Sequence, residues 1–173
     1  MDIDEIAQDV FDEIEASSTK WRSSSKYVRI KGLEIDKRGS FGERLIKHIF
    51  EKEGVSVVYQ GGNPGDWDIV VNNVRIEVKT ASMDVNGKFQ NENIKDTEDC
   101  DCICFIGVAP DSIFMKLEKI CEIDFSKLHN RASKGTGAGY KWDLKPDDMT
   151  EIKTSEEVVK MFCDKGIVTE RSL

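Results

Sequence analysis

Two short apolar runs separated by a pair of asparagines place the strongest constraint on the fold of this chain. Residues 69–71 read Ile-Val-Val, residues 74–79 read Val-Arg-Ile-Glu-Val-Lys, and only Asn72 and Asn73 stand between them. Asparagine tolerates the positive φ that a two-residue hairpin turn requires. Apolar and charged residues alternate strictly along 74–79, so one face of that strand is apolar and the other is charged. We therefore predict a tight β-hairpin.

The charged face of this hairpin brings acidic residues together. With a two-residue turn, Asp68 stands opposite Glu77 and Asp66 stands opposite Lys79. Two opposed carboxylates repel each other, but a hard divalent cation such as Mg²⁺ turns that repulsion into chelation. Because Lys79 shares the face, the arrangement suits cleavage of a phosphodiester. The alternative is an exposed face with an Asp66–Lys79 pair, and a bulge would also shift the register.

The rest of the chain indicates a mixture of helices and strands. A capping-box spacing at Ser40 and Glu43 predicts a helix that begins near Ser40 and ends at Gly54. The polar, irregular stretch at 82–99 has room for a short helix. Together these elements indicate a single domain of the α/β or α+β class. The other expected elements are an amphipathic helix at 3–15, strands at 55–59, 102–108 and 113–117, and a last helix from Ser155 to about Gly166.

The ordered set of acidic residues resembles the PD-(D/E)xK nuclease superfamily. Asp68 opens a strand, Glu77-Val78-Lys79 begins nine residues later, and a helix with the sequence Gly42-Glu43-Arg44-Leu45-Ile46 precedes both. The resemblance covers residues 39–117. It implies a restriction-endonuclease-like core, in which a central mixed β-sheet is flanked by helices in the order αβββαβ.

The resemblance also implies Mg²⁺-dependent hydrolysis of DNA that leaves 5′-phosphate ends, with Mn²⁺ able to substitute. It implies that Asp68, Glu77 and the backbone carbonyl of Val78 bind the metal, and that Lys79 orients or deprotonates the attacking water. It further implies a catalytic role for Glu43, acting through water or a second metal.

Two features of the sequence leave alternatives open. Pro64 lies four residues before Asp68 instead of next to it, which leaves Asp66 as a rival metal ligand. Glu43 has the position of a capping-box residue, so its role is either catalytic or purely structural.

The charge of the chain is unevenly distributed. The net charge of −8 by itself argues against a nucleic-acid partner. Residues 20–31, however, hold five basic residues and no acidic one, and residues 129–145 hold four basic residues and one acidic residue. Basic side chains bind phosphates, and the aromatic residues between them either stack on bases or cover the core. The candidate DNA contacts are Lys20, Arg22, Lys26, Arg29, Lys31, Asn63, Lys134 and Lys141.

We therefore expect a type II restriction enzyme that cuts double-stranded DNA. A homodimer is expected because a double-strand cut needs two active sites. The single nuclease domain would comprise an N-terminal helix and basic segment (1–31), a catalytic core (39–117) and a C-terminal extension with a basic Gly-rich loop (118–173). A Holliday-junction resolvase or repair nuclease of the same fold is one alternative, and a catalytically silent DNA-binding module is another.

Composition predicts a cytoplasmic protein. Five cysteines, an odd number, fit a reducing compartment, and Cys100, Cys102 and Cys104 alternate as they would on one buried face of a strand. No apolar run approaches the roughly 20 residues of a membrane span. The acidic start of the chain differs from a signal peptide, which is basic there. For an acidic nuclease we also expect weak DNA binding when no divalent metal is present.

Overall fold

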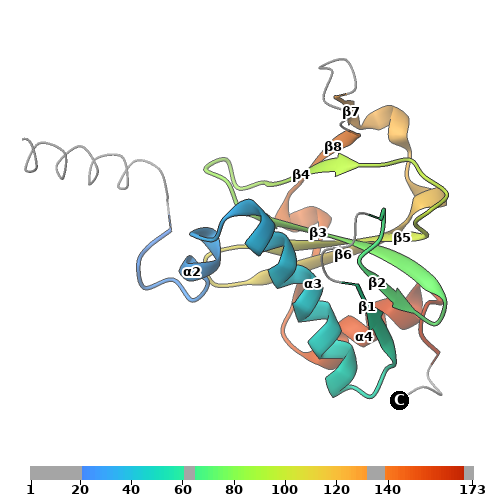
Figure 1. Cartoon of the computed structure of the whole chain (residues 1–173). Coiled ribbons are helices and arrows are strands. Elements are labelled where there is room, and N and C mark those ends of the chain that lie inside the picture. Colours follow the sequence, from blue (N-terminus) through green and yellow to red (C-terminus); the bar gives the residue numbers. More distant parts are fainter. Residues whose placement is uncertain (1–20, 61–64, 132–138, 170–173) are drawn as a thin grey trace, which may run out of the picture.

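The structure is a computed structural model that describes residues 21–60, 65–131 and 139–169, so the expected helix at 3–15 lies outside the described residues. A central sheet of six strands lies between the longer helices on one side and a three-stranded sheet on the other (Figure 1). The central sheet contains β1 (Val57–Tyr59), β2 (Ile69–Val71), β3 (Val74–Ser82), β5 (Cys102–Val108), β6 (Ile113–Lys119) and β9 (Thr150–Ile152). The small sheet contains β4 (Phe89–Ile94), β8 (Tyr140–Leu144) and β7 (His129–Asn130). The helices are α2 (Val28–Lys31), α3 (Ile35–Lys52) and α4 (Ser155–Asp164), with short 3-10 turns η1 (Ile120–Glu122), η2 (Phe125–Lys127) and η4 (Pro146–Asp148).

The predicted hairpin is formed by β2 and β3. Ile69 pairs with Ile76 and Val71 with Val74, which is the register expected for a two-residue turn. Asn72 and Asn73 have φ angles of 48° and 64°, so both occupy the left-handed region that this turn requires.

The central sheet is mixed, as the α+β prediction required. Its strands run in the order β1-β2-β3-β5-β6-β9, and only the β3–β5 pair within it is parallel. The connection between β3 and β5 contains strand β4 and no helix, so the prediction of a short helix within 82–99 was wrong. Phe89, Asn91 and Ile94 are the buried residues of β4, and the strand pairs with β8 instead of remaining irregular.

Helix α3 begins earlier than predicted. Its first residue is Ile35 and its N-cap is Glu34, so Ser40 and Glu43 lie inside the helix and do not form a capping box. The predicted end is correct, because Gly54 follows the helix with a φ of 73°. Helix α4 begins at Ser155 as predicted. None of the described helices combines the length and the apolar character needed to cross a membrane.

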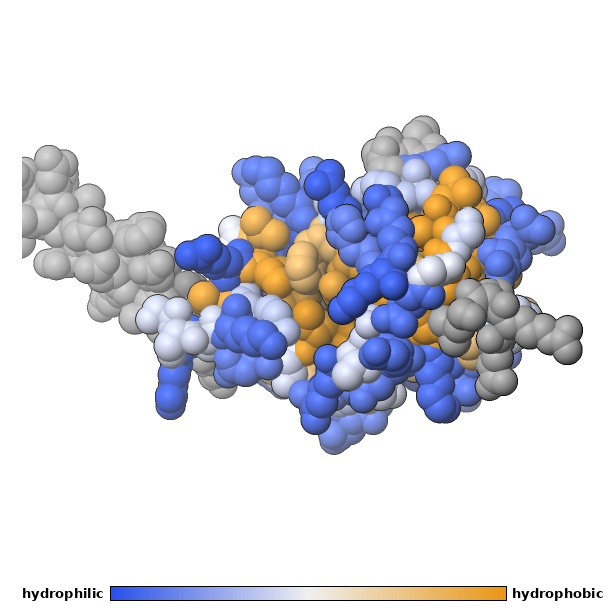
Figure 2. Space-filling model, turned by 90° about the horizontal axis from the view of Figure 1, so that it is seen from below, coloured by the Kyte–Doolittle hydropathy of each residue, from blue (hydrophilic) through white to orange (hydrophobic). Residues whose placement is uncertain are grey.

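Two apolar clusters cover the two faces of the central sheet. One lies between this sheet and helices α3 and α4, and the other lies between the two sheets. Every residue of β5 is buried because both of its faces are covered. Cys102 and Cys104 lie on its helix-facing side, which confirms their predicted role in the core. On the molecular surface, apolar side chains gather in patches separated by a polar band (Figure 2).

Candidate active site

Asp68 lies just before β2 and turns its side chain towards the backbone of β3. Its amide donates to the carbonyl of Ile76 at 2.9 Å, and its carboxylate oxygen Oδ2 accepts from the amide of Val78 at 2.7 Å. The regular ladder ends at the Ile69–Ile76 pair, so Asp68 is not the ladder partner of Glu77 that the simple register predicted. The carboxylate nevertheless lies next to Val78 and within electrostatic reach of Glu77 and Lys79.

Glu77 and Lys79 extend from β3 and form an ion pair with each other. Their side chains are only 15% and 20% exposed, so both are largely removed from water. Burial raises the pKa of Glu77, Lys79 opposes that shift, and the charge of Asp68 adds to it. Burial likewise raises the pKa of Asp68, although the Val78 amide and Lys79 favour its ionised form. Both carboxyl groups therefore lie where negative charge is poorly stabilised.

Glu43 reaches the same site from helix α3. The hydroxyl of Tyr59 donates to its Oε2 at 3.1 Å. Burial and the nearby charge of Asp68 raise the pKa of Glu43 despite this hydrogen bond. The helix can approach β3 closely because Gly42 has no side chain, since a Cβ there would stand 1.9 Å from Oγ1 of Thr80. Glu43 lies well inside helix α3, so it cannot have the N-terminal capping role that was its structural alternative.

The three carboxyl groups have raised pKa values even though Lys79, Lys95 and Arg44 favour their ionised forms, so positive charge near the cluster does not offset burial. Oxygen donors of this kind suit a hard cation, which would stabilise the ionised forms. Among the described residues, no group of three or more His, Cys, Asp or Glu side chains is arranged to hold a metal ion. The donor set still fits Mg²⁺, since this ion is commonly held by one or two carboxylates and keeps several waters.

Asp66, the rival of Asp68, belongs to a different set of contacts. It forms an ion pair with Lys95 and lies 3.5 Å from the hydroxyl of Thr97, and the alternative Asp66–Lys79 pair does not form. Lys95 in turn lies close enough to Glu77 for its charge to favour the ionised carboxylate. Lys95 and Tyr59 are site residues that the sequence did not indicate, because only the tertiary fold brings their segments to the hairpin.

A cleft of about 720 Å³ connects this site to the beginning of helix α3. Glu43, Asp68 and Lys79 line one part of it, and Lys31 and Arg38 line another. Residues of β4 complete the lining, so the strand that replaced the expected short helix forms a wall of the cleft.

Of the candidate DNA contacts, only Lys31 lies in this cleft among those that the structure describes. Lys141 donates to Gln90 at 2.9 Å and pairs with Asp143 at 3.1 Å, so its charge is already balanced. Lys20, Asn63 and Lys134 lie outside the described residues, whereas Arg22, Lys26 and Arg29 are exposed.

The aromatic residues of the basic segments support the interpretation that they cover the core. Trp21 is buried, Trp142 packs edge-on against Phe105 at 5.4 Å between ring centroids, and Tyr140 packs on Phe125 at 5.0 Å. Trp21 is therefore closed to bases, whereas Tyr140 and Trp142 are half-buried and pack against other aromatic rings.

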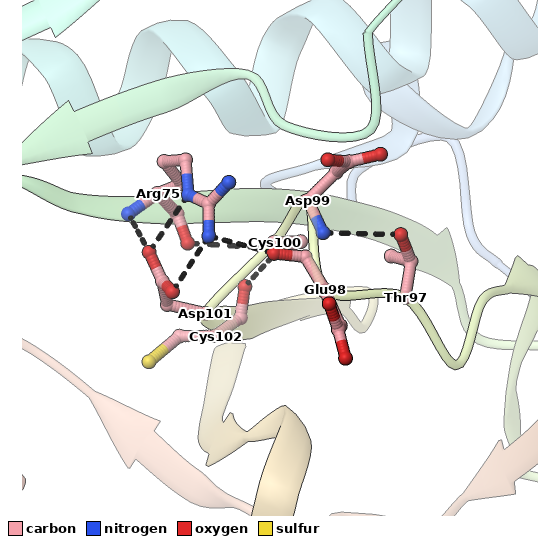
Figure 3. Close-up of polar contacts among 7 residues, drawn as sticks. All are labelled: Arg75, Thr97, Glu98, Asp99, Cys100, Asp101 and Cys102. Atoms are coloured by element: carbon pink, nitrogen blue, oxygen red, sulfur yellow. Dashed lines mark hydrogen bonds and ion pairs between the residues drawn. The ribbon is translucent and has the colours of Figure 1, made fainter.

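Another cavity, of about 900 Å³, lies beside the start of β5, and Asp101 in its lining is paired with Arg75. Arg75 donates to both carboxylate oxygens of Asp101 at 3.0 Å and to the carbonyl of Glu98 at 2.7 Å (Figure 3). Burial raises the pKa of Cys100 to about 12 and that of Cys102 to about 11, so these thiols stay protonated at neutral pH. Neither Cys100 nor Cys102 is therefore an activated nucleophile in this cavity.

No family model matches the chain, and no curated protein matches its sequence. One solved structure with a similar backbone is that of a bacterial homing endonuclease, I-Ssp6803I, with 14% identity and a TM-score of 0.46 over 81% of this chain and 99% of that one. A likeness at this level concerns the path of the backbone, so the functional evidence rests with the side chains described above.

Proposed function

We propose that this protein is a metal-dependent DNA endonuclease. The observation that carries the proposal is the cluster of Glu43, Asp68 and Glu77, three carboxylates with raised pKa values around Lys79. Glu43, Asp68 and Lys79 line one cleft. Carboxylates that are desolvated without enough positive charge cost folding free energy, and such arrangements are typical of catalytic sites.

In this proposal, Asp68, Glu77 and the backbone carbonyl of Val78 would hold Mg²⁺. When bound, the ion would neutralise phosphate charge and lower the pKa of a water molecule. Lys79 orients that water for attack on phosphorus, and its ammonium offsets the negative charge that develops on the phosphate oxygens. A bond forms between the water oxygen and phosphorus, the bond from phosphorus to the 3′ oxygen breaks, and that oxygen takes a proton. The products carry 5′-phosphate and 3′-hydroxyl ends.

We also propose the more specific role of a type II restriction enzyme acting as a homodimer. The described part of one chain contains one such carboxylate cluster, and cleavage of both strands at one place needs two. A pair of chains related by twofold symmetry would present two clefts to a palindromic sequence.

The test is digestion of mixed plasmid and phage DNA with Mg²⁺, followed by sequencing of the ends. Discrete fragments with one common end sequence support restriction, a smear supports a nonspecific nuclease, and selective cutting of four-way junctions supports a resolvase. Glu77→Ala and Lys79→Ala should abolish cleavage, and intact cleavage in either variant contradicts the site. If the wild-type protein binds DNA but cleaves no substrate, the protein is a DNA-binding module instead.

A further inference from the structure

Two positively charged side chains meet in the cleft at the end of β3. Nζ of Lys31 donates to the carbonyl of Met83 at 3.0 Å and lies 3.4 Å from the hydroxyl of Ser82. Nη1 of Arg38 donates to the same hydroxyl at 3.0 Å. Within the described residues, both side chains donate to hydroxyl or carbonyl oxygens and neither donates to a carboxylate. Two like charges thus share one small acceptor.

Asp36 and Asp84 line the same cleft, but within the described part of the chain no hydrogen bond joins the carboxylate of either one to this pair. Ser82 is buried, and Nε of Arg38 is buried without a hydrogen-bond partner among the described residues. Burial lowers the pKa of Lys31, and the charge of Arg38 lowers it further. The carboxylate of Asp84 favours the charged lysine from a distance, but it accepts hydrogen bonds from Asn86, Lys88 and Gln90 within its own turn.

The pair lies in the same cleft as the carboxylate site. Val78 and Ser82 are four residues apart on β3 and both line the cleft, which corresponds to about 13 Å along an extended strand. B-form DNA rises about 3.4 Å per nucleotide along its axis, and each strand also winds around that axis, so two phosphates about 13 Å apart are fewer than four nucleotides apart on one strand. A DNA strand with one phosphate at Asp68 would carry another phosphate near Ser82.

We propose that Lys31 and Arg38 form a phosphate-binding subsite for the DNA strand a few nucleotides from the cleaved bond. The planar guanidinium matches the geometry of phosphate oxygens, and the ammonium adds a point charge beside it. Trp21 helps to hold Lys31 in place, with Nζ 5.6 Å from its ring centroid. The assignment to DNA rests on the proposed nuclease function, whereas the ability to bind phosphate rests on the pair itself.

The first test measures binding of a short duplex in Ca²⁺ at several salt concentrations. Lys31→Gln removes one charge from the pair. Lys37→Gln is the control, because Lys37 is exposed near the start of α3, next to Arg38 in the sequence, and does not line the cleft. We expect Lys31→Gln to weaken binding several-fold and to reduce the slope of log affinity against log salt by about one, as for the loss of one phosphate contact. The proposal is overturned if the two variants bind DNA alike.

The second test uses inorganic phosphate alone, without metal or DNA. Phosphate at millimolar concentration should shift the amide resonances of Ser82 and Met83 in the wild-type protein and in Lys37→Gln, but not in Lys31→Gln. If phosphate binds in this way while Lys31→Gln leaves DNA affinity unchanged, the site takes free phosphate or mononucleotides and the DNA assignment is wrong. If phosphate binds but the wild-type protein never cleaves DNA, the nuclease proposal fails and the anion site stands. Absence of any phosphate shift overturns the subsite.

Discussion

Strand β3 contributes to two clusters that each pair an acid with a base, but the pKa of the acid is shifted in opposite directions in the two. Arg75 and Asp101 form one cluster, where hydrogen bonding from Arg75 lowers the pKa of Asp101 and the pairing raises that of Arg75 (Figure 3). Glu77 and Lys79 belong to the other, where an ion pair also forms but burial still raises the pKa of the carboxyl group. The first pair stabilises both charges, and the second leaves a carboxylate that its surroundings disfavour.

This difference separates a structural contact from a candidate catalytic one. At Arg75 the guanidinium satisfies both oxygens of one acid at the surface and fixes the loop at Glu98. Around Lys79 several acids are partly or largely removed from water, and the charges of Lys79 and the more distant Lys95 do not offset the effect of burial on Glu77. The folded protein tolerates that unfavourable arrangement, and a bound cation would relieve it. The predictions below test whether the two clusters differ in this way.

The largest expected effect is on catalysis. Glu77→Gln should lower the rate of DNA cleavage at least about a hundredfold, because it removes a metal ligand and its negative charge with little change in shape. Asp101→Asn is the matched control, since it removes one carboxylate charge from the other cluster near the same strand. Its cleavage rate should stay within a factor of two of the wild type. Equal losses in both variants would show that the clusters do not differ in function.

Metal binding should stabilise only one cluster. Ca²⁺ or Mg²⁺ in hundredfold excess over its dissociation constant should raise the free energy of unfolding by about 2.7 kcal/mol. The gain should appear as a higher midpoint of thermal unfolding in the wild type and in Asp101→Asn, and it should disappear in Asp68→Asn. A metal-dependent shift that survives Asp68→Asn would place the cation elsewhere.

The two clusters should also shift stability with pH in opposite directions. The folded-state pKa of Glu77 lies above its ordinary value of 4.5, so its favourable contribution is complete below that value and is lost as pH rises through the folded-state pKa. The folded-state pKa of Asp101 lies below 3.8, so its contribution is present above that value and is lost as pH falls through the folded-state pKa.

In EDTA at pH 7, Glu77→Gln should therefore unfold at a temperature a few degrees higher than the wild type, and Asp101→Asn at a slightly lower one. Thermal unfolding followed by circular dichroism from about pH 2 to 8 measures both effects. A lower midpoint for Glu77→Gln at pH 7 would mean that its ion pair with Lys79 outweighs the cost of burying the carboxylate.

Local patterns predicted the hairpin, and tertiary contacts decided the rest of the site. The turn at Asn72-Asn73 and the alternation along β3 depend on neighbouring residues, so the sequence was sufficient to predict the register of the paired strands. Asp68 lies beyond that regular ladder, and its bond to the Val78 amide could not be derived from alternation. Strand β4 was missed because its buried residues pair with β8, a segment about 50 positions later, and the sequence of β4 alone is largely polar.

The smallest predicted effect concerns Tyr59, which touches the site only through Glu43. Tyr59→Phe removes the 3.1 Å hydrogen bond to Oε2 and should lower the cleavage rate several-fold, in keeping with about 1 kcal/mol for one such bond. Tyr140→Phe removes a hydroxyl outside the cleft and serves as the control. Because the hydroxyl positions Glu43, its removal should have no further effect in a Glu43→Gln background, and a double-mutant cycle on the cleavage rate measures this coupling. If the two losses add, Tyr59 does not act through Glu43, and the cluster on this side of β3 extends no further than Asp68, Glu77 and Lys79.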